Sequence, residues 1–431
     1  MARPQSGNII VIGAGAAGLM AARELARAGR RVTILEARDR CGGRINPLAA
    51  ASFGYRADGG AEFVHGEAPV TRALLREAGL SLAPVQGQRW TAQAGQLHLE
   101  SFDDTDDAAL QQALRDVTDD MPIAEFLRRY FAGAQHEQLR HAIRRMVEGY
   151  DAADPERAST LALREEWMGG EQSRQARRIG GGYGALIDLL AAECRKHQVA
   201  LHLGSAVVAI EAGDGGVSVR CANGDAHQAD AIVLTVPPPL LNRIALPLPE
   251  REKVLAAADI GFGNVIKLLL RFDRRWWLDQ HEDLADLTFL ISEAEIPVWW
   301  TQHPADAPVL TGWLAGPKTA AMAHLDEDGL IDAGLASLAA IFGRDPKQLK
   351  RILVAARAID WGRDPYAGGA YSYATPATRA AQARLSHLDG RPVFFSGEAL
   401  YQGRDMGTVE AALASGLETA RAIVGTGDRG D

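Results

Sequence analysis

The chain has 431 residues, of which 47% are hydrophobic and 23% are charged. This proportion excludes a disordered protein, and the length is sufficient for two domains with cores of their own. The formal net charge of −9 argues against a nucleic-acid-binding surface and mildly favours cationic small molecules as ligands.

The cysteines and the chain start also limit the function. Cys41, Cys194 and Cys221 are too few and too widely spaced for a disulfide framework or a structural zinc site. Residues 1–7 carry no secretory leader, and no run approaches the roughly 18 apolar residues that span a bilayer. We therefore expect a cytoplasmic protein with reduced thiols, without metal, membrane contact or nucleic-acid partner.

The first predicted elements are typical of a dinucleotide-binding unit. An apolar strand over residues 8–12 leads into a glycine-rich turn, and a helix begins directly after the turn. A second strand is predicted over residues 31–35. Glu36 stands at its end, about twenty residues on, where a ribose hydroxyl needs an acceptor.

Each glycine of this turn has its own task. Gly13 allows the tight turn, Gly15 lets the backbone approach a pyrophosphate, and Gly18 lets helix and strand pack closely. The amides at the start of the helix then face the phosphates. The pattern predicts a bound adenosine diphosphate group, and it leaves NAD and FAD equally open.

A helical insertion and a return to the first sheet are predicted next. The acidic run Asp103–Asp107 predicts a solvated loop or a helix start, and residues 108–145 have helical periodicity. The expected buried positions of this insertion are Leu110, Leu114, Ile123, Phe126, Leu127 and Ile143. After Gly180–Gly182 we expect a helix and a β-meander, and then an apolar strand over residues 231–236 that is buried in a parallel sheet.

In the last part of the chain we expect a second domain, followed by a final strand and a final helix. Six tryptophans, which predict either an aromatic pocket or a bulky core, stand at positions 276, 277, 299, 300, 313 and 361. A strand over 392–396 and a helix from about 406 to 424 close the chain. We expect two interleaved domains: a cofactor domain of residues 1–80, 176–247 and 386–431, and a substrate domain of residues 81–175 and 248–385.

Four segments, taken in order, resemble the flavin-containing amine oxidases, the family of the monoamine oxidases, polyamine oxidases and histone lysine demethylases. They are the N-terminal glycines through Gly42-Gly43-Arg44, the segment Asp58–Gly66, the segment Gly263–Leu268, and Trp361–Tyr371 joined to Ser396–Gly416. The resemblance implies an α/β fold, in which a Rossmann-like FAD-binding domain of the glutathione-reductase type is interleaved with an α+β substrate domain.

The resemblance implies FAD as the cofactor. Arg44 would meet a phosphate, Glu398 would bind a hydroxyl, and the helix that starts near Gly407 would stabilise negative charge near flavin N1. Ala370 stands where monoamine oxidases have the cysteine that attaches flavin, so we expect noncovalent FAD. The residues expected to hold FAD are Gly13, Gly15, Ala17, Gly18, Glu36, Ala37, Arg38, Gly43, Arg44, Gly60, Ala61, Glu62, Val207, Gly397, Glu398, Gly407 and Thr408.

Four residues are candidates for the chemistry. Periodicity alone favours Lys267 as a lysine that reaches solvent from a strand, whereas the resemblance assigns it a water beside flavin N5. Tyr371 matches one wall of the family's aromatic cage, and Thr408 stands where the second tyrosine would be. His65 is either a polar group on the substrate side or a histidine packed beneath the cofactor.

The leading hypothesis is oxidation of an amine. A hydride leaves the carbon beside nitrogen for flavin N5, the imine is hydrolysed, and dioxygen reoxidises the flavin with release of hydrogen peroxide. One alternative is a flavin-dependent desaturase or amino-acid oxidase; the latter needs a pocket arginine, for which Arg363 and Arg404 are candidates. Another is a nonenzymatic FAD-binding protein that docks a partner. The particular amine and the oligomeric state stay open.

Overall fold

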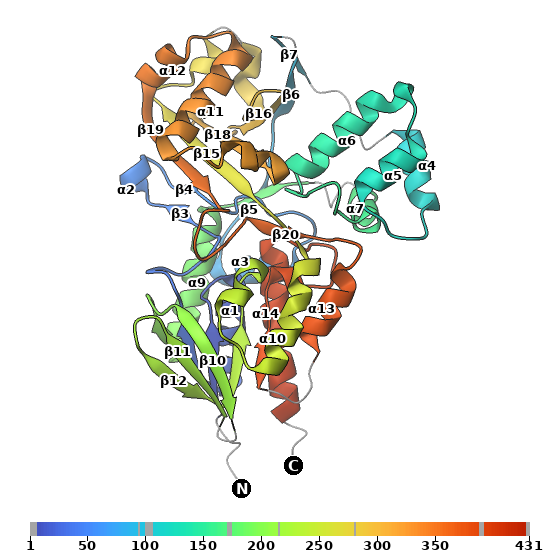
Figure 1. The fold of residues 1–431 in the computed structure, drawn as a ribbon. Helices are drawn as coiled ribbons and strands as arrows, with labels where there is room; N and C mark the ends of the chain where they lie inside the picture. The colour runs from blue at the N-terminus through green and yellow to red at the C-terminus, as the bar shows by residue number, and fades with distance from the viewer. Residues whose placement is uncertain are drawn as a thin grey trace.

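The computed structural model describes residues 7–93, 95–99, 107–169, 175–213, 216–279, 282–387 and 392–427. Two sheets organise these residues, a five-stranded parallel sheet and a seven-stranded mixed sheet. The mixed sheet lies above the parallel sheet in Figure 1, and a group of helices stands to one side of both. Within the described residues, none of the helices has the length and the hydropathy to cross a bilayer.

The parallel sheet has the strand order β21-β13-β1-β2-β9. Its strands are β1 (Asn8–Ile12), β2 (Arg31–Leu35), β9 (Ala200–His202), β13 (Ala231–Leu234) and β21 (Val393–Phe395). β1 pairs in parallel with β2 on one side and with β13 on the other. The predicted parallel sheet is confirmed, and it combines strands from the start, the middle and the end of the chain.

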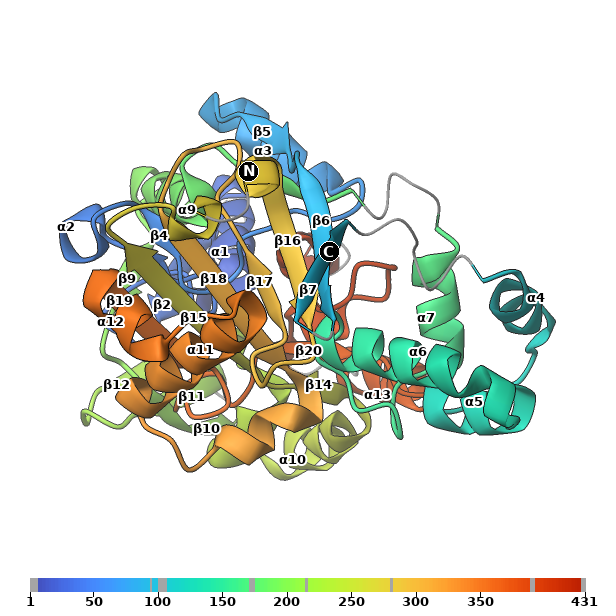
Figure 2. The same ribbon diagram turned by 90° about the horizontal axis from the view of Figure 1, so that it is seen from above.

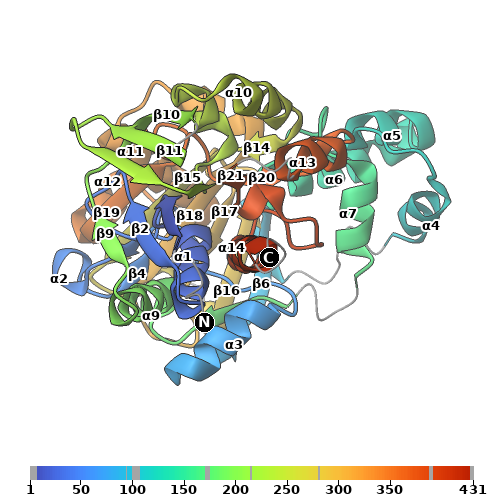
Figure 3. The same ribbon diagram turned by 90° about the horizontal axis from the view of Figure 1, so that it is seen from below.

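Both faces of this sheet are covered, which explains why its strands read as continuous apolar runs. Ile9 and Val11 face a helical layer, whereas Ile10 and Ile12 face an antiparallel β-meander (Figure 3). The helices are α1 (Ala16–Arg27), α3 (Pro69–Ala78), α9 (Gly182–Lys196) and α14 (Val409–Gly427). The meander consists of β10 (Val207–Gly213), β11 (Gly216–Cys221) and β12 (Ala226–Ala229).

The mixed sheet has the order β19-β15-β18-β17-β16-β6-β7. Its strands follow one another from left to right in Figure 2. Its strands are β6 (Gln88–Gln93), β7 (Gln96–Leu99), β15 (Val265–Phe272), β16 (Leu287–Ser292), β17 (Val298–Trp300), β18 (Val309–Ala315) and β19 (Leu353–Asp360). The helices α11 (Glu327–Phe342) and α12 (Pro346–Ile352) pack on one face. In β15, Ile266, Leu268 and Leu270 face these helices, so Lys267 points to the opposite face.

The helical insertion is built from several short helices rather than one long one. They are α4 (Ala108–Asp116), α5 (Ile123–Tyr130), α6 (Glu137–Gly149) and α7 (Thr160–Trp167). All six expected buried positions are at most 1% exposed, as predicted. Asp107 caps α4 through a hydrogen bond from the Leu110 amide, which confirms a helix start there, while residues 103–106 lie outside the described part.

Smaller elements join the two sheets. β14 (Gly261–Gly263) pairs with β20 (Tyr371–Tyr373), and β5 (Leu82–Pro84) pairs with β8 (Arg177–Ile179). The remaining helices and strands are β3 (Pro47–Leu48), α2 (Ala50–Phe53), β4 (Ala57–Asp58), α10 (Leu248–Val254) and α13 (Thr378–Ser386). Short 3-10 segments lie at Ala134–His136, Pro238–Arg243, Leu255–Asp259, Trp276–Leu278, Glu282–Asp286, Gly316–Met322 and Glu398–Leu400.

Packing refines the division of the chain. Val254, Ala257 and Ala381 belong to the same hydrophobic cluster as Ile10 and Ile12 of the parallel sheet. α10, the 3-10 segment after it and α13 therefore pack with the parallel sheet, although the sequence placed them in the substrate domain. The domain boundaries themselves stay a prediction.

Candidate active site

The glycine turn between β1 and α1 has the geometry of a phosphate cradle. Gly13 has a φ of +106°, and a Cβ there would lie 2.5 Å from Thr235 Oγ1. A Cβ at Gly18 would collide with the Gly13 carbonyl oxygen, because the helix packs tightly on the turn. In contrast, a Cβ at Gly15 would have only the Gly42 carbonyl oxygen nearby, at 4.0 Å. Two glycines therefore serve packing, and Gly15 leaves open space in front of the backbone.

The N-terminus of α1 has the features of an anion-binding site. No side chain caps the helix at Gly15, and no acidic residue stands in its first turn. The first amides of a helix lack partners within the helix and attract negative charge. The Gly42 amide donates to the Ala14 carbonyl at 2.8 Å, which brings Gly43 alongside the turn. This arrangement fits the pyrophosphate of FAD.

Glu36 is fixed at the end of β2, as predicted. Its carboxylate is 5% exposed and accepts hydrogen bonds from the Ala14 amide at 2.6 Å and the Arg38 amide at 2.8 Å. The Arg38 guanidinium forms a bidentate pair with Asp364, at 2.9 and 2.6 Å. Val207 opens β10 and packs partly buried against the meander cluster. Glu36 thus has the position of a ribose acceptor, while the Arg38 side chain has a protein partner.

Arg44 and Glu398 are brought together from positions 354 residues apart. Arg44 Nη1 lies 2.7 Å from Glu398 Oε1 and 2.8 Å from the Ala370 carbonyl oxygen. The other Glu398 oxygen accepts a hydrogen bond from Ser372 Oγ. Gly397, with a φ of +144°, has open space where a Cβ would be, and all three predicted residues line one cavity. A cationic group beside open backbone fits a phosphate-bearing cofactor.

Lys267 does not reach solvent, so the expectation from periodicity is wrong for this residue. The side chain is 1% exposed on the face of β15 that points away from α11. Its ammonium donates to Glu62 Oε2 at 2.9 Å and to the Gly60 carbonyl at 3.1 Å. It also lies 5.3 Å from the centre of the Trp300 ring. The cation is retained in an apolar setting because it has a buried counter-ion.

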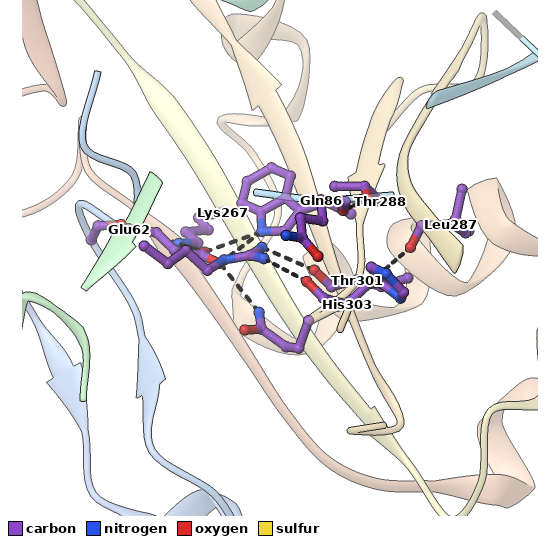
Figure 4. A network of polar contacts seen from close by, with 11 residues as sticks. Glu62, Gln86, Lys267, Leu287, Thr288, Thr301 and His303 are labelled. Carbon is purple, nitrogen blue, oxygen red and sulfur yellow. Dashed lines mark hydrogen bonds and ion pairs between the residues drawn. The ribbon is translucent and has the colours of Figure 1, made fainter. Parts of the chain in front are cut away.

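Glu62 is the centre of the polar network drawn in Figure 4. Besides Lys267, its carboxylate accepts from Trp300 Nε1 at 3.1 Å, Gln302 Nε2 at 3.2 Å and Arg178 Nε at 3.2 Å. Burial raises the pKa of the Glu62 carboxyl, but the charges of Lys267 and Arg178 outweigh this effect and hold the pKa below its usual value. The expected cofactor residue thus directs its carboxylate toward Lys267.

An aromatic wall stands beside this network. Trp313 lies opposite Lys267 in the pairing of β15 with β18, and its ring stacks on Tyr371 with 6.5 Å between centroids and 22° between planes. Trp300 packs on Trp313 at 5.7 Å. The Tyr371 hydroxyl donates to the Tyr150 carbonyl at 2.7 Å, at the end of α6. Tyr371 is therefore part of an aromatic surface next to Lys267, as expected for a cage wall.

The sequence did not separate these two tryptophans from the others. Trp276, Trp277 and Trp299 are buried in the core under α11. The signal that distinguishes Trp300 and Trp313 is strand alternation: each stands one residue from a position that faces the helices, and therefore points to the face of Lys267.

His65 lies close to the aromatic wall. Its Nδ1 is 3.1 Å from the Tyr150 hydroxyl, and its ring packs edge-on against Tyr150 and Phe63. Burial lowers the pKa of His65 to about 4, so the imidazole is neutral at neutral pH. His65 is thus packed and also hydrogen-bonded to a residue whose backbone holds Tyr371.

Thr408 uses its hydroxyl within its own turn. Thr408 Oγ1 donates to the Asp405 carbonyl at 2.6 Å and accepts from the Ala411 amide at 3.1 Å. It therefore caps the start of α14. A Cβ at Gly407 would lie 3.5 Å from Tyr371 Cδ2, which places this turn beside the aromatic wall.

A pair of partly buried acids that interact electrostatically with Tyr371 was not predicted. Asp151 and Glu166 share a hydrogen bond, and burial raises the pKa of Glu166 to about 7 and that of Asp151 well above its usual value. The two arginines considered for a carboxylate pocket are both exposed, and Arg363 donates to the Leu325 carbonyl at 2.6 Å. Arg404 lines a separate open cavity with Arg115 and Arg164.

The chain matches known proteins over nearly its whole length. The family model for flavin containing amine oxidoreductase covers residues 16–424. Polyamine oxidase 2 of Arabidopsis thaliana is 29% identical, over 97% of this chain and 88% of that protein. Lysine-specific histone demethylase 1 homolog 3 of the same plant is 27% identical over 97% of this chain, which spans only 30% of that protein.

Solved structures share the fold. Putrescine oxidase bound to putrescine superposes with a TM-score of 0.79 at 20% identity, over 97% of this chain and 99% of that chain. Cyclohexylamine oxidase from Brevibacterium oxydans gives a TM-score of 0.79 at 22% identity, over 98% of this chain and all of that chain.

Proposed function

The chain belongs to the family of flavin-containing amine oxidoreductases, and from this premise we propose that it oxidises a small amine at a centre formed by Lys267, Trp313 and Tyr371. FAD is the cofactor of this oxidoreductase. The observation that carries the proposal is the buried Lys267 ammonium opposite Trp313, whose ring stacks on Tyr371. A buried cation and an aromatic wall on one face of a sheet provide charge and an apolar surface at the same place.

The chain's own residues would hold the cofactor without a covalent bond. Gly15 and the start of α1 would bind the pyrophosphate, Glu36 a ribose hydroxyl, and Arg44 a phosphate. Ala370 offers a methyl group in place of a sulfur, so no thioether can form there. When bound, FAD supplies the acceptor for a hydride from the carbon beside the amine nitrogen, and dioxygen takes the electrons to give hydrogen peroxide.

Tyr371 and Trp313 would select the reactive form of the amine. An ammonium has no nitrogen lone pair to assist the loss of a hydride from the neighbouring carbon. Burial against two aromatic rings disfavours a charged amine and lowers its pKa. The imine formed would then be hydrolysed.

Lys267 would provide positive charge at the reacting centre. An ammonium in a site with little water acts more strongly than one at the surface, since few water dipoles screen it. His65 would contribute indirectly, because its hydrogen bond to the Tyr150 side chain helps to fix the residue whose carbonyl holds Tyr371.

The proposal is tested by mixing the purified protein with a panel of amines without oxygen. Flavin absorbance in the protein, its bleaching by at least one amine, and peroxide after admission of air are the expected results. A protein that holds flavin but is bleached by no amine would overturn the proposal and would favour a nonenzymatic FAD-binding role. Lys267→Met should slow flavin reduction or reoxidation; unchanged rates of both would remove its assigned role.

The geometry gives less support to an amino-acid oxidase. Such an enzyme needs a buried arginine for the substrate carboxylate. Arg363 and Arg404 are both exposed, and the partly buried Arg178 is already paired with Glu62 at 3.1 Å. The panel should therefore include amino acids beside their decarboxylated amines, and we expect faster bleaching by the amines.

A further inference from the structure

Glu62 binds a denser set of donors than a simple ion pair requires. Four side chains converge on its buried carboxylate: Lys267, Arg178, Trp300 and Gln302. Lys267 lies in β15, Arg178 in β8 and Trp300 at the end of β17, and Gln302 stands two residues after β17. Glu62 comes from the segment that follows β4, and Figure 4 shows its carboxylate beside Lys267. The carboxylate thus joins the segment beside the cradle to the sheet that carries Lys267.

The charges around Glu62 do not balance. Lys267 and Arg178 contribute two positive charges to one carboxylate, and a further acid, Asp58, interacts electrostatically with all three. Burial and the Glu62 charge raise the pKa of Asp58 to about 7, so Asp58 is at most partly charged at neutral pH. Loss of the Glu62 charge would leave the buried Lys267 and the partly buried Arg178 without the carboxylate to which both are hydrogen-bonded.

The bonds of Lys267 define a direction. An ammonium has three N–H donors. Two of them are directed to Glu62 Oε2 and to the Gly60 carbonyl, and both acceptors belong to the same three-residue segment. In the described residues these are the only hydrogen bonds of the ammonium, so its third N–H is free to meet a further partner in the site. The segment 60–62 decides where that N–H points.

Arg178 is held separately. Its guanidinium donates to the Thr301 carbonyl at 3.0 Å and the His303 carbonyl at 3.3 Å, besides Glu62. Trp300 and Gln302 likewise keep the carboxylate in one place from the side of β17. Glu62 is thus fixed by three partners that do not move with Lys267, and it can act as a rigid support.

We propose that Glu62 is the positioning residue of Lys267: it keeps the ammonium charged and aims its free N–H at the reacting centre. A carboxylate at 2.9 Å favours the charged form of an amine, and the isosteric amide of glutamine does not. In this role Lys267 acts as a fixed charge and exchanges no proton during turnover. The kinetic part of this inference rests on the proposed amine oxidation, whereas the hold of Glu62 on the ammonium does not.

The chain offers a direct readout, because it contains only six lysines. Protein labelled with ¹³C at lysine Cε gives few NMR signals. The signal that is missing from the spectrum of Lys267→Met belongs to Lys267. In Glu62→Gln we expect the Cε titration of Lys267 to move to lower pH by about one unit or more relative to the natural protein. An unchanged titration overturns the proposal.

Two further variants separate positioning from general damage. Arg178→Gln removes another donor and a positive charge from the same carboxylate but leaves the pair of Glu62 and Lys267, so the Lys267 titration should not move to lower pH. Glu62→Asp keeps the charge but shortens its reach, and should give a shift between those of the other two variants. If Glu62→Gln does not fold, the difference between these two variants carries the test, and equal titrations in both overturn the proposal.

Stopped-flow measurements connect the pair to the reaction. In Glu62→Gln, the rate of the step that depends on Lys267 should fall about tenfold on raising the pH through the new titration, while the natural protein stays flat over that range. A pH-independent rate in the variant would overturn the assigned role in catalysis. If the Cε signal shifts as expected but no amine reduces the flavin of the natural protein, the amine oxidation fails and the positioning of Lys267 stands.

Discussion

Trp313 stands directly opposite Lys267 in the antiparallel pairing of β15 with β18. Residues opposite each other in such a pair project to the same face of the sheet. The indole and the ammonium therefore share one face, and the stacking of Trp313 on Tyr371 extends this face to β20. One face of the mixed sheet thus carries residues of the proposed reacting centre.

Truncation of the aromatic wall should weaken amine binding. Loss of one stacked ring removes about 1.4 kcal/mol, which corresponds to about a tenfold rise in KM for Trp313→Ala. Trp313→Phe loses the hydrogen bond to the Gly149 carbonyl but keeps a ring, and should retain most of the affinity. Peroxide formation against amine concentration measures both. Tyr130→Ala, which removes an exposed aromatic ring, is the control and should leave KM unchanged. An unchanged KM in Trp313→Ala would contradict the assignment.

Substitutions in the glycine turn should separate cofactor binding from stability. Gly15→Ala has room for its methyl group in the protein, so the apoprotein should lose no more than about 1 kcal/mol, whereas FAD affinity should fall at least tenfold. Gly18→Ala forces a collision with the Gly13 carbonyl and should cost about 1–3 kcal/mol of stability. Thermal unfolding of the apoprotein and FAD titration measure the two effects. Gly149→Ala, with no atom within 4 Å, is the control; normal FAD affinity in Gly15→Ala would refute the cradle.

The flavin should leave the protein when the fold is lost. Ala370 has no sulfur for a thioether; its amide donates to the Gly263 carbonyl, and its carbonyl accepts from the Arg44 guanidinium. Acid precipitation should therefore release all flavin absorbance into the supernatant. Flavin that stays with the washed pellet would show attachment at another residue.

Stability should fall as the pH rises through the titration of the buried acids. Burial raises the pKa of Glu166 from about 4.5 to about 7, so the folded protein binds more protons than the unfolded chain between these values. The free energy of unfolding therefore decreases with pH in this window, and is largest below it as far as Glu166 is concerned. Glu166→Gln should flatten the dependence of Tm on pH from about 4.5 to about 7. Glu165→Gln changes an exposed neighbour and should leave the dependence of Tm on pH as it is in the natural protein. Equal slopes of Tm against pH in the two variants would refute the assignment.

Local patterns were sufficient to predict the parts of the fold with continuous signals. Gly13, Gly15 and Gly18 each require a particular backbone environment, so their spacing predicted the turn and its flanking elements. The strand predicted over residues 231–236, which spans Ala231–Leu234 in the structure, was recognised because burial on both faces demands apolar residues throughout. In these cases the residue type follows directly from one local requirement: glycine from a tight or crowded backbone, and apolar residues from burial on both faces of a strand.

The side-chain partners in the site could not be predicted, because they depend on distant segments. Lys267 lies among apolar residues, which suits a surface lysine and a buried one equally well until Glu62 is placed beside it. Asp151 and Glu166 look like surface acids in sequence, and they come together only when the segment that follows α6 meets α7. Register across β15 and β18 similarly selected Trp313 from six tryptophans.

The parallel sheet has a consequence for biosynthesis. Its last strand, β21, is formed by residues 393–395, and α14 packs so closely on α1 that a Cβ at Gly416 would collide with the Ala17 carbonyl. The ribosome releases the N-terminal turn first, but the segments that pack against it emerge last. In a nascent chain the glycine turn therefore lacks β21 and α14 until residues 393–427 have left the ribosome.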